Sequence, residues 1–245
     1  EELQCAHVGI IAQAFLGGHI KYTRTEPPPQ ERFTDQYLKR MDPSKIYFLS
    51  SDISEIKNKT VKQWEQVLGQ DCKFLDDIQK ILAVRVKERA EFAKTFLDKK
   101  YKFDSKVEFI FDPDKKPYPA SKKEAEDFLK KYIHFQISNY LASDMPLEEA
   151  KTNVIKYWDR SVKRFSEMKA DDIRAAYLDS FARSLDPHSS FFSKDVFEDF
   201  EIQMRLSLEG IGATLSNQDG FTVVESLVPG GAAAPVRTPQ QRGPR

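Results

Sequence analysis

The sequence predicts a mainly α-helical fold, with a multi-helix N-terminal domain followed by one β-hairpin near the C-terminus. Three observations support this class. No glycine occurs between Gly69 and Gly210, and because glycine is costly within a helix, its absence indicates continuous helix. Large apolar residues there recur every three or four positions, as on one face of a helix. From residue 206 onward the pattern changes to β-like alternation.

Three apolar stripes define the principal predicted helices, over residues 74–97, 129–141 and 154–165. Their members are Phe74, Ile78, Leu82, Val86, Ala90, Ala93, Leu97, Leu129, Ile133, Ile137, Leu141, Val154, Trp158, Val162 and Phe165. A start signal agrees with the second stripe, because Ser121 followed by Glu124 forms a capping box. The stripes therefore predict several packed helices.

A short pattern occurs twice along the chain. The Met-Asp-Pro of residues 41–43 is followed by Phe48, and the Leu-Asp-Pro of residues 185–187 is followed by Phe192. Each copy continues into an Asp-x-x-Glu helix start. Because proline disfavours helix at the residue before it, we expect each copy to end one helix, turn, dock its aromatic ring and start another helix. Two copies do not make a repeat protein.

Two segments carry β character. Residues 107–111 do, but this segment is too short to set the fold. Near the C-terminus, Thr214, Leu215 and residues 221–224 alternate around a turn at residues 217–220, which predicts a hairpin.

The composition changes again after the hairpin. The tail is rich in arginine, proline and glutamine and has no aromatic residue, so it cannot pack a core. The predicted organisation is a helical domain over residues 1–205, a partial domain over 206–231 and an irregular tail over 232–245.

Composition excludes several functional classes. The 245 residues include 38 basic and 38 acidic side chains, so the net charge is zero and a nucleic-acid-binding surface is not expected. No apolar run reaches the ~18 residues of a membrane span. Cys5 and Cys72 make no disulfide framework and have no metal-spaced neighbour, so they are expected to be buried thiols.

No catalytic set, metal site or cofactor motif is found by pattern. The sequence has no phosphate-binding loop, nucleophile elbow, H-E-x-x-H or C-x-x-C motif. His188 lies between Asp186 and Ser189, but catalytic triads are assembled from distant segments, so His188 is interpreted as a turn residue. We expect no catalytic residue, no metal and no cofactor.

The most specific stretch for binding is Gly210, Ile211, Gly212 and Ala213, directly before a predicted strand. Two glycines around an apolar residue permit consecutive backbone N–H groups to point the same way. Such a nest can bind the carboxylate that ends a peptide, while the strand edge pairs with the peptide backbone. Taken alone, Gly-x-Gly more often makes a tight turn, and that alternative stays open.

Several separated motifs resemble one family. Phe-Ala-Arg-Ser-Leu-Asp-Pro-His-Ser-Ser-Phe-Phe-Ser at residues 181–193 and Ser-Leu-Glu-Gly-Ile-Gly-Ala at residues 207–213 resemble the tail-specific (carboxyl-terminal processing) serine peptidases. Residues 35–43 and 47–52 are similar to the N-terminal region of the long bacterial periplasmic type. The resemblance extends over residues 15–231.

This resemblance implies a helical domain, then a PDZ domain, then a catalytic domain with a Ser/Lys dyad. Gly210, Ile211, Gly212 and Ala213 match the carboxylate-binding loop of the PDZ domain. The likeness stops after residue 231, before the groove helix and the dyad, so this chain alone is expected to be inactive as a peptidase.

The implied partners are protein or peptide substrates with nonpolar C-termini and an adaptor protein, and the implied location is the periplasm. The alternative is a non-catalytic helical interaction or adaptor protein with a module that binds peptide C-termini.

Overall fold

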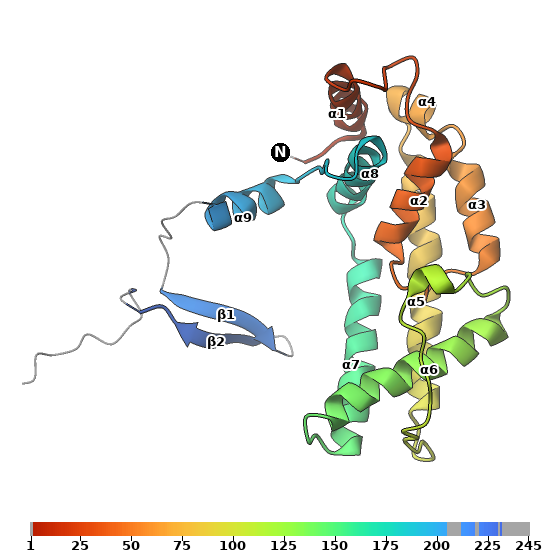
Figure 1. The fold of residues 1–245 in the computed structure, drawn as a ribbon, viewed down its shortest axis with the longest axis vertical. Helices are drawn as coiled ribbons and strands as arrows, with labels where there is room; N and C mark the ends of the chain where they lie inside the picture. Colours follow the sequence, from red (N-terminus) through yellow and green to blue (C-terminus); the bar gives the residue numbers. More distant parts are fainter. Residues whose placement is uncertain (1, 205–211, 219–220, 230, 232–245) are drawn as a thin grey trace, which may run out of the picture. The chain divides into compact units, whose positions relative to one another are not determined.

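The structure, a computed structural model, describes residues 2–204, 212–218, 221–229 and 231. It divides into two compact units, residues 1–191 and residues 192–245. The predicted fold class is confirmed, because helices dominate and a two-stranded hairpin lies near the C-terminus (Figure 1). The predicted domain boundary at residue 205 and the predicted tail stay predictions.

The helical unit contains α1 (Cys5–Gly17), α2 (Gln30–Met41), α3 (Ser50–Thr60), α4 (Gln63–Leu68), α5 (Lys73–Phe96), the 3₁₀ turn η1 (Pro113–Lys115), α6 (Lys122–Leu141), α7 (Leu147–Ser166) and α8 (Ala170–Leu185). The second unit contains α9 (Lys194–Met204), β1 (Ala213–Gln218) and β2 (Phe221–Leu227). In the helical unit α5 packs along α7, α2 packs on α8, and α6 crosses both α5 and α7 (Figure 1).

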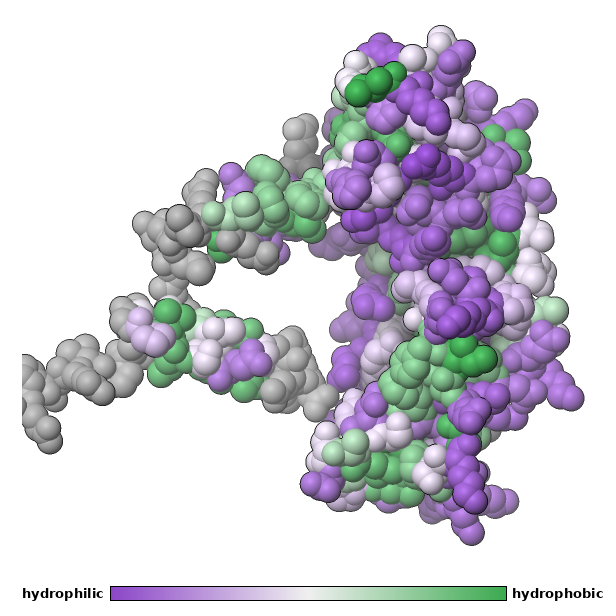
Figure 2. Space-filling view, in the orientation of Figure 1, coloured by the Kyte–Doolittle hydropathy of each residue, from purple (hydrophilic) through white to green (hydrophobic). Residues whose placement is uncertain are grey.

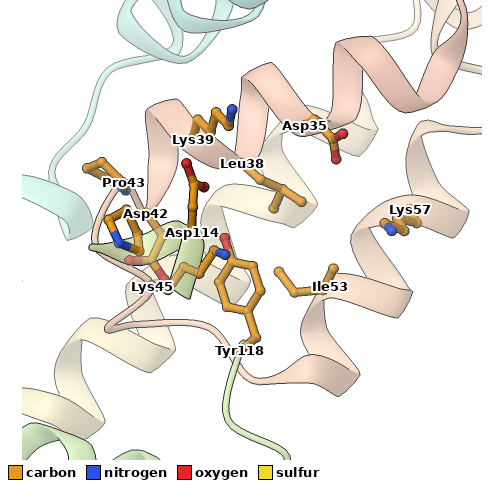
Figure 3. Close-up of a pocket in the computed structure, with 11 residues that line it drawn as sticks. Asp35, Leu38, Lys39, Asp42, Pro43, Lys45, Ile53, Lys57, Asp114 and Tyr118 are labelled. Carbon is orange, nitrogen blue, oxygen red and sulfur yellow. The ribbon is translucent and has the colours of Figure 1, made fainter. Parts of the chain in front are cut away.

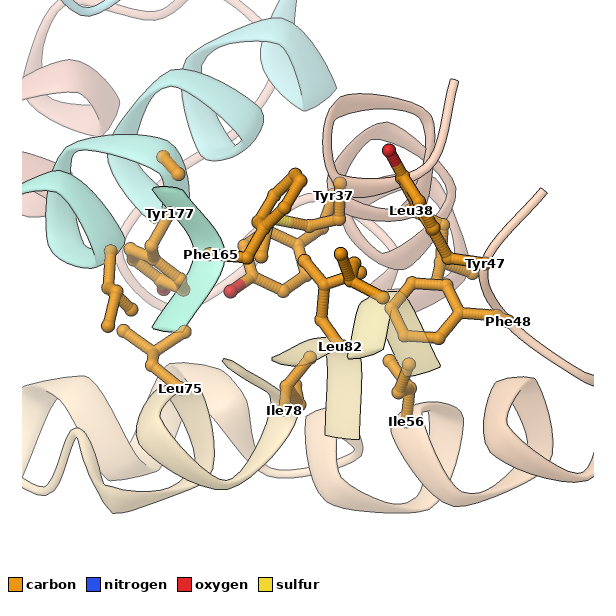
Figure 4. Packing of buried hydrophobic residues seen from close by; sticks show 14 of the residues in the cluster. Tyr37, Leu38, Tyr47, Phe48, Ile56, Leu75, Ile78, Leu82, Phe165 and Tyr177 are labelled. Atoms are coloured by element: carbon orange, nitrogen blue, oxygen red, sulfur yellow. The ribbon is translucent and has the colours of Figure 1, made fainter. Parts of the chain in front are cut away.

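The predicted apolar stripes form the core of the helical unit. The residues of the first stripe, along α5, are all buried. Trp158 of α7 is fully buried, and its ring makes edge contacts with Tyr47, Tyr132 and Tyr157. Figure 4 shows how side chains of α2, α5, α7 and α8 meet in this core. These helices are therefore held by mutual burial of their apolar faces.

The glycine-free run is not continuous helix, so that prediction is wrong in part. A segment without α-helix, which contains η1, separates α5 from α6. Three prolines in its second half, Pro113, Pro117 and Pro119, are poor helix residues because they lack an N–H and restrict the residue before them. The predicted capping box is confirmed in part, since Ser121 Oγ accepts a hydrogen bond from Glu124 N at 3.2 Å before α6, whereas the Glu124 carboxylate accepts from Ala120 N at 2.8 Å and not from Ser121 N.

The strand character of residues 107–111 does not produce a strand, because these residues pair with no other described segment. The hairpin at the C-terminus is confirmed: β1 pairs antiparallel with β2, with Ala213 opposite Leu227 and an irregularity between Thr214 and Leu215. Among the described residues, no helix is both long and apolar enough to cross a membrane.

Both proline corners end one helix and lead into another as predicted, but only the first docks its predicted aromatic ring in the core. Phe48 is fully buried between α2 and α3. Phe192, in contrast, is 41% exposed and contacts Phe200 of α9 at 5.4 Å between ring centroids. Its neighbour Phe191 packs against the core instead, because the Phe191 N–H is held by Asp179 Oδ1 at 3.1 Å.

The interpretation of the cysteines as free thiols is wrong, because Cys5 and Cys72 form a disulfide. Their Cα atoms lie 5.9 Å apart although 67 positions separate them in sequence. The approach depends on Gly9, where a Cβ would lie 2.7 Å from the Val67 carbonyl oxygen. The missing side chain lets α1 lie close against α4, which places Cys5 beside Cys72.

Reducing this disulfide is expected to lower the free energy of unfolding by about 2–4 kcal/mol, because the bond closes a long loop in the unfolded chain. Denaturant unfolding of the oxidised and reduced protein measures the difference. The Cys5→Ser/Cys72→Ser variant is the control and should unfold identically with and without reductant. Identical unfolding midpoints for oxidised and reduced native protein would contradict the disulfide.

Candidate functional site

The predicted carboxylate-binding loop is described only in part. Gly210 and Ile211 lie outside the described residues, whereas Gly212 and Ala213 lie inside them. Gly212 has a φ of 73°, in the left-handed region that favours glycine. Its carbonyl accepts a hydrogen bond from Val228 N at 2.8 Å, directly before Ala213 begins β1.

A second glycine lies at the same open end of the hairpin. A Cβ on Gly231 would lie 2.7 Å from the Gly212 Cα, so only glycine fits without displacing the backbone. The Gly231 N–H donates to the Val228 carbonyl at 2.9 Å. Because neither glycine has a side chain, the backbone is not covered by side-chain atoms of these two residues where the predicted loop joins β1.

The helical unit carries a cavity of about 630 Å³ between α2, α3 and the segment around η1 (Figure 3). Its lining combines apolar and charged side chains. They are Asp35, Leu38, Lys39, Asp42, Pro43, Lys45, Ile53, Lys57, Pro113, Asp114 and Tyr118. Pattern reasoning missed this cavity, because its lining comes from three segments with no shared motif.

Asp42 is a buried structural acceptor in the wall of this cavity. Its carboxylate accepts hydrogen bonds from the backbone N–H groups of Ile46, Tyr47 and Phe48 at 2.9–3.0 Å. Arg89 donates hydrogen bonds to the Ile46 and Tyr47 carbonyls at 3.2 and 2.8 Å. Both N–H and C=O groups of this turn therefore have side-chain hydrogen-bond partners. Burial raises the pKa of the Asp42 carboxyl, and the three amide bonds oppose that shift. These partners make Asp42 a turn-former rather than a reactive group.

Two lysines lie beside this turn. Lys45 has a φ of 49°, and its Nζ donates to the Lys116 carbonyl at 3.1 Å. Lys116 Nζ is buried 3.4 Å from the centroid of the Phe128 ring and has no hydrogen-bond acceptor among the described residues. Burial lowers the pKa of Lys116 to about 8, and nearby Asp42 opposes the shift. The ring face and Asp42 are what stabilise this ammonium group.

Lys116→Met is expected to raise the free energy of unfolding at pH 7 by about 1–2 kcal/mol, because it removes a charge buried without a hydrogen-bond acceptor. The folded pKa lies below that of the unfolded chain, so the native protein gains stability as pH rises from about 8 to 10.5. This gain should disappear in Lys116→Met and persist in Lys115→Met. Unfolding curves between pH 7 and 11 test this, and equal slopes in all three proteins would contradict it.

A second buried carboxylate lies at the end of the helical unit. Asp179 of α8 accepts hydrogen bonds from Arg40 Nη1 at 2.6 Å, Arg183 Nε at 3.0 Å and the Phe191 N–H at 3.1 Å. It therefore joins α2, α8 and the last residues of this unit. The sequence analysis missed Asp179. Its position four residues before Arg183 on a predicted helix could have indicated an ion pair between the two side chains.

His188 lies in an exposed turn. Its Nδ1 is 3.3 Å from Asp186 Oδ1, and 95% of its side chain is exposed. Ser190 Oγ accepts from Arg183 Nη2 at 3.1 Å rather than from His188. These residues stabilise a turn and assemble no nucleophile–base pair. In the part of the chain that the structure describes, no group of three or more His, Cys, Asp or Glu side chains is placed to hold a metal ion.

Comparison with known proteins gives one family. The model of the tail specific protease N-terminal domain matches residues 11–195. A tail-specific protease from Haemophilus influenzae is 32% identical over 216 residues, which cover 88% of this chain and 31% of that relative. The chain thus spans about a third of the length of this relative. The chain belongs to the tail-specific protease family, and the helical unit is the N-terminal domain of that family.

Proposed function

We propose that this chain is the N-terminal scaffold and part of the substrate-recognition region of a tail-specific serine endopeptidase that degrades or processes proteins from their C-terminus in the bacterial periplasm. The observation that carries the recognition part is the left-handed φ of Gly212 at the open end of the hairpin. A nest of backbone N–H groups requires such a change of handedness between neighbouring residues.

The proposed ligand is a protein C-terminus with nonpolar side chains. Its carboxylate accepts hydrogen bonds from the N–H groups of residues 210–213, and its backbone extends along the hairpin. Leu215, Val223 and Val224 are substantially exposed and offer apolar surface to such a peptide. The peptide bond is cut elsewhere in the longer protein, where a lysine acts as general base for a serine.

The Cys5–Cys72 disulfide supports the proposed location, because disulfides persist in oxidising compartments such as the bacterial periplasm. The cavity beside α2 and the surfaces of the helical unit are proposed to hold an adaptor protein or position the substrate. These roles require no catalytic group in this chain.

Gly212→Val is expected to weaken binding of a peptide with a free C-terminus at least tenfold, because a β-branched residue is strained at a φ of 73° and redirects the amides of the nest. Titration is best done on a longer chain that contains the whole PDZ domain, because binding to this chain alone is expected to be feeble. Thr214→Val is the matched control, since it introduces the same valine side chain two residues away, at an exposed strand position. Unchanged affinity in Gly212→Val would contradict carboxylate binding and would mean that the two glycines only form a turn.

A further inference from the structure

His134 of α6 is a buried histidine whose two ring nitrogens both contact the segment that follows α5. It is 9% exposed, and its ring is surrounded by the rings of Phe96, Tyr101 and Phe103, at 5.1–6.1 Å between centroids. Nδ1 lies 3.0 Å from the Tyr101 hydroxyl oxygen, and Nε2 accepts a hydrogen bond from the Asp104 N–H at 3.2 Å. One imidazole therefore ties this segment to α6.

The bond from Asp104 fixes the protonation state of this ring. A backbone N–H can only donate, so Nε2 must carry a lone pair and no proton. The neutral ring then has its proton on Nδ1, where it donates to the Tyr101 oxygen. Burial lowers the pKa of His134, and the nearby Asp104 carboxylate opposes the shift. Adding a proton to Nε2 would remove the acceptor of the Asp104 amide.

Two titratable groups face the ring, Tyr101 and Asp104, and both lie on the segment after α5. Burial raises the pKa of Tyr101 to about 12, so its hydroxyl stays protonated at neutral and acidic pH. From α5 the ring meets Phe96, which carries no charge. The Asp104 carboxylate holds its own turn, since its Oδ1 accepts from the Lys106 N–H at 2.9 Å. A protonated ring would attract this carboxylate toward Nε2 and displace the Asp104 amide.

The turn at Asp104 has room to open without unpacking α6. A cavity of about 190 Å³ is lined by side chains of residues 103–111 and of α6, including His134 and Ser138. The chain beyond the turn stays on α6, because the Phe109 ring contacts three aromatic rings of that helix. Figure 2 shows apolar surface where this part of the chain covers α6. Between these two attachments, the turn depends on its bond to His134.

We propose that His134 is a pH-sensitive latch for the turn at residues 103–107. When the ring is neutral, Nε2 holds the Asp104 amide and the turn is closed over the cavity. When the ring is protonated, the amide loses its acceptor, the turn opens and solvent reaches the cavity from this side. The latch belongs to the helical unit alone and does not depend on the proposed recognition of a C-terminus.

The latch predicts a definite pH dependence. In the open turn His134 is solvated and takes up a proton at its ordinary pKa of about 6.5, whereas the closed turn resists that proton. Opening is therefore independent of pH well above 6.5 and becomes more favourable as pH falls below it. Between pH 7.5 and 5.5 the opening equilibrium should rise about five- to tenfold.

NMR on the full chain tests the latch. The nitrogen shifts of the His134 ring report its tautomer and its protonation, and hydrogen exchange reports the protection of the Asp104 amide. His134→Gln keeps a side-chain acceptor for this amide but cannot take up a proton in this range. His188→Gln is the matched control, because it makes the same substitution at a side chain that is 95% exposed. Any protonation of Asp42, whose pKa burial also raises, would act equally in all three proteins.

We expect a neutral ring with its proton on Nδ1 at pH 7.5, and a five- to tenfold loss of Asp104 amide protection at pH 5.5 after correction for intrinsic exchange. The loss should persist in His188→Gln and disappear in His134→Gln. If His134→Gln does not fold, the unsubstituted protein still decides, because its Asp104 amide should exchange freely once the ring is protonated. Equal protection at both pH values, the same loss in folded His134→Gln, a protected Asp104 amide beside a protonated ring, or a proton on Nε2 at pH 7.5 would each overturn the proposal.

Discussion

Replacing Trp158 with alanine is expected to lower the free energy of unfolding by about 3–5 kcal/mol. The indole is fully buried on α7 and contacts rings from three other positions, Tyr47, Tyr132 and Tyr157. Its Nε1 donates to Gln136 Oε1 at 3.2 Å, so the substitution also leaves that side-chain acceptor without its partner. Since α6, α7 and the turn after α2 meet at this ring, the loss should affect the whole helical unit.

Equilibrium unfolding in denaturant, followed by helical circular dichroism, measures this effect. Phe197→Ala is the matched control, because it deletes a half-exposed ring on α9 of the second unit. The control should change the unfolding of the helical unit by less than about 0.5 kcal/mol. A loss below about 1 kcal/mol in Trp158→Ala would mean that the indole does not occupy the core.

Asp42→Ala is expected to cost about 3–5 kcal/mol, because it removes the acceptor of three buried N–H groups at once. Without the carboxylate, the turn that places Tyr47 and Phe48 in the core has no internal acceptor for these amides. Asp42→Asn should have an intermediate effect, since its single carbonyl oxygen can accept only some of the bonds.

The chain supplies its own control for this prediction. Asp186 occupies the corresponding position in the second copy of the proline pattern, but it is half exposed and accepts one amide, from His188. Asp186→Ala should therefore cost less than about 1 kcal/mol under the same conditions. Equal losses in the two variants would show that the hydrogen-bonded turn after α2 does not stabilise the fold.

Much of the helical unit could be predicted because periodicity and capping are local properties. The stripes along α5, α6 and α7 required only the spacing of apolar residues, and Ser121 with Glu124 marked the start of α6. The hairpin followed from alternation around a turn. In each case, one short window of sequence contains the whole physical cause.

Two of the errors, on the cysteines and on the second proline corner, concern features that depend on contacts between distant segments. The Cys5–Cys72 bond needs the close approach of α1 to α4 at Gly9, which no spacing rule encodes. The two proline corners look alike locally, yet Asp179 holds the N–H of Phe191 and so selects that ring rather than Phe192 for the core.

From the sequence, only the residue types of the candidate site could be predicted. Gly-x-Gly before a strand indicated a nest, and Gly212 has the backbone conformation that such a loop needs. The cavity beside Asp42 carries no sequence motif, because it is formed by segments that meet only in the folded chain.

The most direct test of the proposed recognition role is calorimetry with one peptide that ends in apolar residues, prepared as a free acid and as an amide. It is titrated into a longer chain that extends through the whole of the proposed PDZ domain. We expect clear binding of the acid and at least tenfold weaker binding of the amide, because amidation removes the charge that residues 210–213 are proposed to hold. Equal affinity for acid and amide would contradict carboxylate recognition and leave this end of the hairpin as a turn.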